Sequence, residues 1–234
     1  MSSVIVDYRT DKKIVTALNI LGYQVIPSTN NTNVSVALSG HPDMQICNCG
    51  NNTFVCAPEC YNYYKNVLTD PNIHLICGKT VLGCNYPYDV AYNVAWIGDI
   101  AVCNKKHTDS VVVETLINSG IKIVDVSQGY SKCNICIVDN NAVITSDKGI
   151  YTALKDIGMN ALLIDKGHID IFGWEYGFIG GTSGKICDEK LAFCGNLALH
   201  PDYERILNFC AGYDVECISL SDKRLMDSGS LILV

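Results

Sequence analysis

The feature that most constrains the fold of this chain is a phrase that occurs five times. Each copy consists of an amphipathic helix pattern, a residue that ends the helix, and a short apolar, β-branched run. Four copies end the helix at a glycine (Gly22, Gly120, Gly158 and Gly212) and continue into YQVIP, IKIVDV, MNALLID and YDVECIS. Glycine adopts the left-handed conformation that closes a helix, and the apolar run that follows is typical of a buried strand. In the fifth copy, PECYNYYKNVL, the pair Asp70-Pro71 ends the helix before IHLIC.

After each of these strands the sequence predicts a hairpin. The five segments are DMQICNCGNNTFVCA, NVAWIGDIAVCN, CNICIVDNNAVITS, DIFGWEYGFIGG with a longer return through LAFCG, and RLMDSGSLILV. Gly50-Asn51-Asn52 and Asp139-Asn140-Asn141 are typical of tight turns. The last segment lacks one strand, and SSVIVDY at the start of the sequence has the length to supply it. Strands from both ends would then close a circle of units and leave no open sheet edge.

Five such units resemble the pentein superfamily, also called the guanidine-modifying enzyme fold. The resemblance extends over nearly the whole chain and implies an α/β propeller of five pseudo-symmetric ββαβ units around a central polar channel, formed by one domain over residues 1–234. A doubly wound α/β sheet would also explain the alternation of helix, glycine and strand. It would not explain the five hairpins.

Two units repeat the order Gly, His, any residue, Asp and apolar side chains. One copy is GHPDMQIC from Gly40 and the other is GHIDIFGW from Gly167. The phrase falls just before a hairpin, where a ring of units directs its loops toward the axis. Aligning all five units brings polar side chains to this inner mouth: His41 and Asp43, Tyr92 and Asn93, Tyr130 and Lys132, His168 and Asp170, Asp222 and Arg224. Convergent polar groups at a concave surface predict a binding site.

The resemblance implies specific roles at this mouth. In the related enzymes a carboxylate holds a substrate guanidinium, a histidine transfers protons, and a cysteine near the C-terminus attacks the guanidino carbon. Asp43 matches the carboxylate of the first unit, and Asn93 matches a polar ligand of the second.

The resemblance ends at the catalytic positions. Where dimethylarginine hydrolases and arginine deiminases carry the histidine, this chain reads GYSKCN. Where they carry the cysteine it reads MDSGSL, so that Asp227, Ser228 or Ser230 stands near that position, and no cysteine follows Cys217. The sequence therefore predicts a site without the standard Cys-His machinery, unless Cys133 or His168 supplies the chemistry from a rearranged position.

Two classes of function remain open. In the first, the mouth binds or acts on a small guanidino, amidino or amide ligand. Asp43 and Asp170 would grip a positive head group, Asn93 would orient it, and His41 or His168 would carry a proton. The other candidate ligand-binding residues are Tyr130, Lys132, Asp222, Arg224 and Asp227. In the second, the chain is a non-enzymatic protein-interaction module, because a translation initiation factor that binds the large ribosomal subunit also uses this fold.

Composition narrows the partners. The 234 residues carry a net charge of −7, and lysine or arginine runs are no longer than Lys12-Lys13 and Lys105-Lys106. This pattern argues against nucleic acid and anionic membrane partners. The N-terminus lacks a signal-peptide pattern and no apolar stretch approaches membrane-spanning length, so we expect a cytoplasmic protein whose thirteen cysteines are mostly buried hydrophobic residues. The sequence does not define an oligomeric state.

The remaining motifs predict neither a cofactor nor a metal site. IGGTSGKIC, from Ile179, departs from the phosphate-loop pattern, and we interpret Gly180–Gly184 as a flexible insertion in the fourth hairpin and a potential lid over the mouth. Cys133 and Cys136 have zinc-like spacing, but residues three apart in a strand face opposite sides. His200-Pro201-Asp202 repeats the tripeptide at His41, and we interpret it as the start of a helix.

Overall fold

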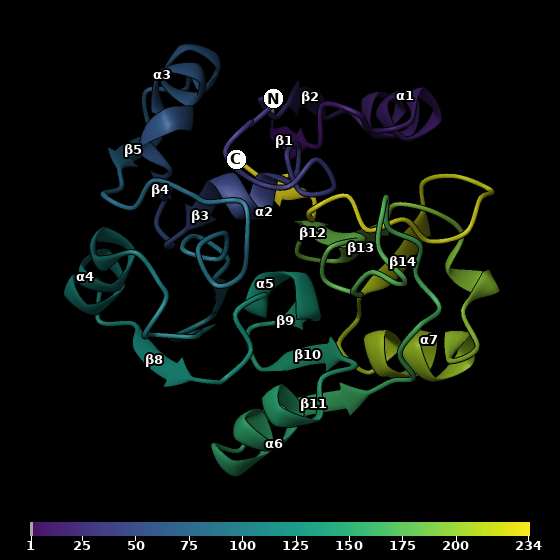
Figure 1. The fold of residues 1–234 in the computed structure, drawn as a ribbon. Helices are drawn as coiled ribbons and strands as arrows, with labels where there is room; N and C mark the ends of the chain where they lie inside the picture. Colours follow the sequence, from purple (N-terminus) through teal and green to yellow (C-terminus); the bar gives the residue numbers. More distant parts are fainter. Residues whose placement is uncertain (1) are drawn as a thin grey trace.

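Five small sheets surround a common axis and carry their helices on the outside (Figure 1). The computed structural model describes residues 2–234. Four units follow one another as strand, strand, helix, strand. They are β3 (Ile46–Asn48), β4 (Thr53–Cys56), α3 (Pro58–Val67) and β5 (His74–Cys77); β6 (Ala95–Ile97), β7 (Ile100–Cys103), α4 (Ser110–Asn118) and β8 (Lys122–Asp125); β9 (Ile135–Asp139), β10 (Ala142–Thr145), α6 (Lys148–Asp156) and β11 (Asn160–Leu163); and β12 (Ser183–Cys187), β13 (Lys190–Phe193), α7 (Tyr203–Ala211) and β14 (Glu216–Ser219).

The fifth unit is assembled from both ends of the sequence. It comprises β15 (Ile232–Leu233), β1 (Ser3–Val6), α1 (Lys12–Ile20) and β2 (Gln24–Pro27). β15 pairs antiparallel with β1, with Val4 opposite Leu233, and β1 pairs parallel with β2. In the other four sheets too, the first strand is antiparallel to the second. The third strand is parallel to the second. The predicted ring of five ββαβ units, closed by SSVIVDY, is therefore confirmed.

All five outer helices pack on their sheets through the same spacing. Each buries two residues four positions apart, which lie on one face of a helix. The pairs are Ile14 and Leu18, Cys60 and Tyr64, Val112 and Leu116, Ile150 and Leu154, and Ile206 and Cys210. The repeated pair is the packing counterpart of the repeated phrase in the sequence.

The predicted helix ends are correct in three units and shifted in a fourth. Gly22, Gly120 and Gly158 have φ of 91°, 77° and 82°, as a left-handed helix end requires. Gly212 instead keeps a helical φ of −65°, and Asp214 adopts the left-handed conformation with φ 56°. The last helix ends at Ala211, and its left-handed residue is Asp214, two positions after the glycine.

The fourth hairpin starts later than the sequence predicted. Its first strand is SGKIC (Ser183–Cys187), not DIFGWEYGFIGG, so residues 164–182 form a long irregular segment before β12. Gly180, Gly181 and Gly184 are buried, and a Cβ at any of them would lie 2.0–2.3 Å from atoms of neighbouring segments. The prediction of a flexible lid at Gly180–Gly184 is wrong, because these glycines permit close packing rather than motion.

The first strands of the five sheets line a channel of about 210 Å³. Its wall is mixed, with Ile46, Val94, Ile137 and Leu231 beside the polar Asn48, Lys132, Asn140 and Lys185. Two short helices, α2 (Pro42–Gln45) and α5 (Ser131–Asn134), precede β3 and β9. They carry the polar side chains that gather near the axis.

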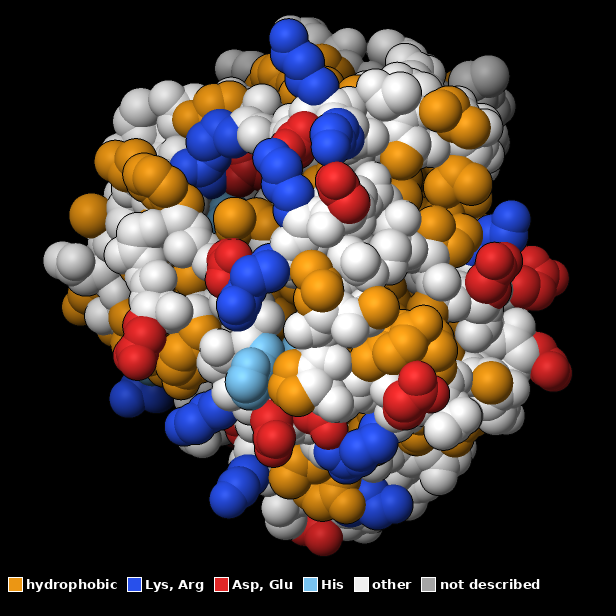
Figure 2. Space-filling view, turned by 90° about the vertical axis from the view of Figure 1, so that its right-hand side faces the viewer, with side chains coloured by type: hydrophobic (Ala, Val, Ile, Leu, Met, Phe, Trp, Pro, Cys, Tyr) orange, Lys and Arg blue, Asp and Glu red, His pale blue; other side chains and the backbone are white. Residues whose placement is uncertain are grey.

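The outer surface carries charges of both signs. On the face in Figure 2, acidic and basic side chains are interspersed and hydrophobic side chains form small separate patches. Among residues 2–234, no helix combines the length and the apolar character needed to cross a membrane.

Candidate functional site

Asn93 connects the polar segments of three units. Its Nδ2 donates to the Asp43 backbone oxygen at 3.1 Å, and its Oδ1 accepts from the backbone N–H groups of Lys132 (2.8 Å) and Cys133 (3.2 Å). The side chain is 1% exposed. Every hydrogen bond of this amide is therefore used to hold α2 against α5.

Asp43 lies beneath this junction in a second network. Ser230 Oγ donates to Asp43 Oδ2 at 2.7 Å and accepts from Lys132 Nζ at 3.0 Å. The hydroxyl therefore bridges a buried carboxylate and an ammonium group. Ser230 is fully buried and has φ 71°, an unusual backbone conformation for a residue with a side chain. Asp43 Oδ1 is also buried and has no hydrogen-bond partner.

Cys133 contacts the same carboxylate. Its Sγ lies 3.2 Å from Asp43 Oδ2 and 3.2 Å from Asn93 Nδ2. Burial, followed by the negative charges of Asp43 and Asp227, raises the pKa of the Cys133 thiol well above its ordinary value. The thiol stays protonated at neutral pH and is a poor nucleophile in this position.

A cavity of about 550 Å³ opens beside these networks. It lies between the β1–α1 connection, the irregular segments 28–41 and 164–182, and the segment 220–231. His41, Asp170, Arg224 and Asp227, all predicted site residues, line it. Asp43, Asn93, Lys132 and Cys133 are gathered behind the His41 and Asp227 side of the wall and do not line it.

Asp227 has the most buried acidic side chain in this wall. Phe178 N donates to its Oδ2 at 2.8 Å and Gly229 N to its Oδ1 at 3.1 Å. A Cβ at Gly181 would lie 2.0 Å from Asp227 Oδ1, and one at Gly177 would lie 2.4 Å from Asp227 Cβ. Glycine at both positions lets the backbone close around the carboxyl group.

Burial raises the pKa of Asp227 from 3.8 to about 6. The neighbouring His41 lowers this pKa by less than burial raises it, and the negative charge of Asp43 raises it further. A carboxyl group with a pKa near neutrality can exchange a proton under physiological conditions.

His41 stands next to Asp227 in the cavity wall. Its Nδ1 lies 3.9 Å from Asp227 Oδ1, its side chain is 2% exposed, and the Nδ1 atom has no hydrogen-bond partner. A Cβ at Gly229, which has φ 75°, would lie 2.4 Å from His41 Cα. The imidazole and the carboxyl group are thus held together, with hydrogen-bonding capacity left on the imidazole.

The remaining acidic side chains of the cavity wall are paired with cations. Asp7 binds Arg9 through two hydrogen bonds, Asp11 Oδ2 lies 2.7 Å from Lys223 Nζ, and Asp170 Oδ1 lies 3.3 Å from Arg224 Nε. Among the residues of this wall, Asp227 is the carboxylate without a lysine or arginine partner.

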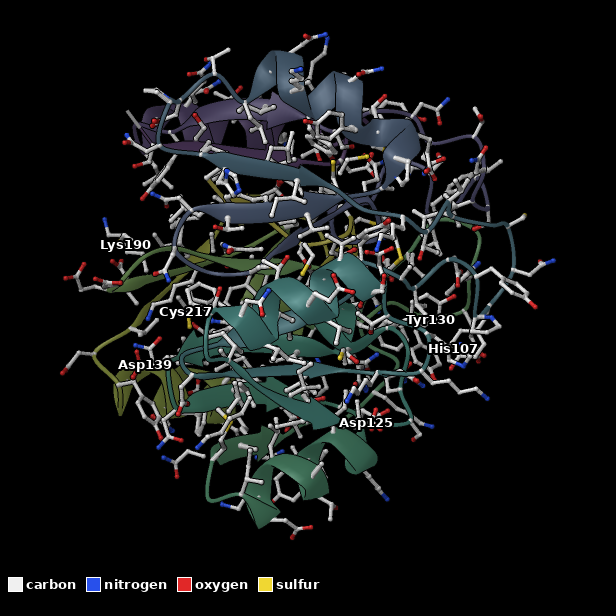
Figure 3. The ribbon with its side chains drawn as sticks, turned by 90° about the vertical axis from the view of Figure 1, so that its left-hand side faces the viewer. His107, Asp125, Tyr130, Asp139, Lys190 and Cys217 are labelled. Carbon is white, nitrogen blue, oxygen red and sulfur yellow. The ribbon has the colours of Figure 1, made fainter. Side chains whose placement is uncertain are left out.

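Three predicted site residues lie elsewhere. Tyr130 OH donates to Asp89 Oδ2 at 2.7 Å, His168 is exposed and packs against His200 with ring centroids 5.6 Å apart, and Asp222 Oδ1 pairs with Lys13 Nζ at 3.0 Å on the surface. Tyr130 and His107 lie at the opposite edge of the molecule from Asp139 and Lys190 (Figure 3). His168 and Asp170 miss the axis because the segment they begin runs on for a dozen residues before β12.

Sequence reasoning missed most of the cavity wall, including Asp7 and Cys194. Asp7 follows β1 directly, so the closing of the ring by the N-terminal strand was a signal for it. Cys194 follows β13, and burial raises the pKa of its thiol to about 12. His200-Pro201-Asp202 precedes α7 as predicted, with Asp202 N donating to His200 Nδ1 at 3.1 Å. Within residues 2–234 no three metal-ligating side chains come together.

Comparisons with known proteins agree with this architecture. A family of unknown function (DUF6873) matches residues 5–232. A comparison with curated protein sequences finds no match. Among solved structures, a DDAH from Pseudomonas aeruginosa, a cysteine-to-serine mutant complexed with citrulline, is 10% identical with a TM-score of 0.56, and the match covers 93% of this chain and 92% of that one.

Two further structures give similar values. SxtG, an amidinotransferase of the saxitoxin biosynthetic pathway from Microseira wollei, is 11% identical with a TM-score of 0.54, covering 94% of this chain and 88% of that one. A dimethylarginine dimethylaminohydrolase adduct with 4-chloro-2-hydroxymethylpyridine is 9% identical with a TM-score of 0.55, covering 94% and 92%. At these identities the similarity shows the fold, which is that of the pentein superfamily.

Proposed function

Because this chain belongs to a family of unknown function, DUF6873, and has the pentein, or guanidine-modifying, fold, we propose its function from the cavity itself: it binds a small ligand with a cationic guanidino or amidino head group beside His41 and Asp227. The observation that carries this proposal is the state of Asp227. It is a buried carboxylate with no lysine or arginine partner in a wall where the other carboxylates have one.

The chemistry of the head group follows from the atoms of Asp227. Each carboxylate oxygen accepts one backbone hydrogen bond and keeps lone pairs for further donors. A planar cation with two parallel N–H groups satisfies both oxygens at once and offsets the cost of burying the charge. His41 Nδ1 offers one additional polar contact at the same depth.

The same pair supports proton transfer rather than thiol chemistry. Asp227, with its pKa raised to about 6 by burial, is suited to take up and release protons, and the His41 imidazole lies beside it. The pKa values of Cys133 and Cys194 are both raised by burial. The proposal therefore includes no covalent intermediate on cysteine, and any reaction at this site would use His41 and Asp227.

The test is a calorimetric and thermal-shift titration of the full chain with guanidinium, agmatine, arginine, citrulline and neutral amides. A ligand that binds only the folded state raises the melting temperature by mass action. We expect cationic guanidines to bind wild type, the Asp227→Asn variant to lose this binding, and the Asp188→Asn variant to keep it. Asp188 is an exposed carboxylate between β12 and β13, outside the cavity wall.

Two results would contradict the proposal. One is the absence of binding by every cation in a folded sample, and the other is binding that persists in Asp227→Asn. The first result would favour the alternative function, a non-enzymatic interaction module of the same fold. The exposed Tyr86, Tyr88 and Trp174 would then be the first surface to test for a protein partner.

A further inference from the structure

The cavity that holds Asp227 has an apolar rim. Val36 is 72% exposed, Phe172 64%, Tyr8 42% and Met226 40%, and all four line the cavity. Large apolar side chains that line a cavity mark the part of a site that contacts the apolar body of a ligand. The polar wall at His41 and Asp227 and the apolar rim therefore serve different parts of one molecule.

The two most exposed rim residues, Val36 and Phe172, come from segments that contact each other. Val36 comes from the irregular segment 28–41 of the first unit, and Phe172 from the irregular segment 164–182 of the fourth. A Cβ at Gly173 would be in van der Waals contact, at 3.8 Å, with the Ala37 Cβ. The side chains of Val36 and Phe172 thus project from adjacent backbones and can enclose a ligand from two sides.

The cations around the cavity are already engaged. Arg9 donates to both oxygens of Asp7 and to the backbone oxygens of Val36 and Ala37, and its guanidinium lies over the Tyr8 ring, 5.4 Å from the centroid. Lys223 Nζ is paired with Asp11, and Arg224 Nε with Asp170. A ligand carboxylate at this rim would share its cation with one of these aspartates and would lie beside that second negative charge.

From these contacts we infer that the ligand is a guanidine or amidine with an apolar alkyl or aryl body and without a carboxylate, not a free amino acid. This inference rests on the proposed function, because it places the cationic head at Asp227. The volume of about 550 Å³ lies within the range that accommodates a ligand larger than a bare guanidinium ion. The body fills the remaining space against Val36, Phe172 and Met226.

A matched set of ligands tests the inference by calorimetry on the full chain. Butylguanidine and 4-guanidinobutanoate have the same length and differ only in a terminal methyl or carboxylate group. We expect butylguanidine and benzamidine to bind at least tenfold more tightly than guanidinium, and 4-guanidinobutanoate to bind at least tenfold more weakly than butylguanidine.

Variants separate the two halves of the site. The double variant Val36→Ser, Phe172→Ser changes exposed side chains, so the fold should persist. It is expected to reduce the affinity for benzamidine toward that of guanidinium and to leave guanidinium binding unchanged. The Asp170→Asn variant releases Arg224 and is expected to narrow the difference between butylguanidine and 4-guanidinobutanoate.

The outcomes distinguish this inference from the proposed function. If guanidinium binds in an Asp227-dependent manner but butylguanidine binds no more tightly than 4-guanidinobutanoate, the inference is overturned and the proposed function stands. The same conclusion follows if the rim variant leaves benzamidine binding intact. If no cation binds, both are overturned.

Discussion

Replacement of Asp227 by asparagine is expected to remove a pH dependence of stability that arises from one buried carboxyl group. Burial raises the pKa of Asp227 from 3.8 to about 6 in the folded protein. Between these two pH values the folded state binds a proton that the unfolded state has lost. The stability that this protonation contributes is fully present below pH 3.8 and is lost as the pH rises through 6.

The magnitude follows from the same two values. One pKa unit corresponds to about 1.4 kcal/mol, and at pH 4 the unfolded carboxyl group is still partly protonated, so the free energy of unfolding should fall by about 2 kcal/mol between pH 4 and pH 7 on account of Asp227 alone. Other groups act in this range: burial lowers the pKa of His200, which weakens the folded state as the pH falls below its ordinary value of 6.5. His200 is present in both proteins, so the difference between wild type and variant isolates Asp227.

The assay is urea unfolding of both proteins at intervals from pH 4 to pH 7, under reducing conditions. Asparagine has one acceptor oxygen where Asp227 accepts from both Phe178 N and Gly229 N, so the variant carries a constant loss at every pH. We expect its free energy of unfolding relative to wild type to improve by about 2 kcal/mol as the pH rises from 4 to 7. A difference that stays constant across the range would refute a raised pKa at Asp227.

Three further predictions concern packing around the site. Gly181→Ala should destabilise the protein by about 1–3 kcal/mol in urea unfolding, because a Cβ there would overlap the Asp227 carboxyl group. The control Gly212→Ala should change the free energy of unfolding by less than about 0.5 kcal/mol, because Gly212 has a helical φ and a Cβ there would have its nearest contact at 3.4 Å. Equal effects of the two substitutions would contradict the packing described. Asn93→Ala should lower the free energy of unfolding by about 2–4 kcal/mol in the same assay, since it leaves the Lys132 and Cys133 N–H groups without their acceptor. A decrease below about 1 kcal/mol would show that Asn93 does not hold α2 and α5 together. In thiol titration of the native protein, the exposed Cys77 and Cys84 should react first. Cys133 should react only on unfolding, when all thirteen thiols become available. Rapid modification of Cys133 in the native protein would show that the centre of the ring is open.

The sequence predicted the ring because its signals are local. The residue that ends each helix, a glycine in four units, and the apolar run that follows depend on conformations of a few neighbouring residues. The buried pairs four positions apart repeat in all five helices. The circle closed as expected because SSVIVDY matched the missing strand in length and character.

The fourth unit shows where local signals fail. GHIDIFGW resembles GHPDMQIC in sequence, yet His41 leads into α2 and β3, whereas His168 is followed by a long irregular segment. The glycines of IGGTSG suggested mobility, but the same absence of a side chain lets Gly181 approach Asp227. Sequence alone does not distinguish a glycine that bends from one that packs, because the difference depends on a segment distant in the chain.

In the candidate site too, the sequence predicted the residues that repeat within each unit and missed the contacts between distant segments. Asp43, Asn93, Lys132 and Cys133 come together from the short segments before β3, β6 and β9. The unit alignment placed the first three of them at one mouth. The cavity beside them requires Asp7, the segment 28–41 and the segment 220–231 to meet, which happens only across the closure of the ring. No repeat within a unit could have indicated that junction.

The pairing of β15 with β1 also sets the order in which this protein can mature on the ribosome. Val4 finds its partner, Leu233, only after nearly all of the chain has been synthesised. Asp227, which helps form the cavity wall, lies in the segment that leads into β15 and accepts hydrogen bonds from Phe178 and Gly229. Until residues 220–233 have been synthesised, the sheet of β1 and β2 lacks β15 and the cavity lacks the wall that contains Asp227. Because the proposed ligand would bind only the closed ring, its binding would stabilise the pairing of β15 with β1 by mass action.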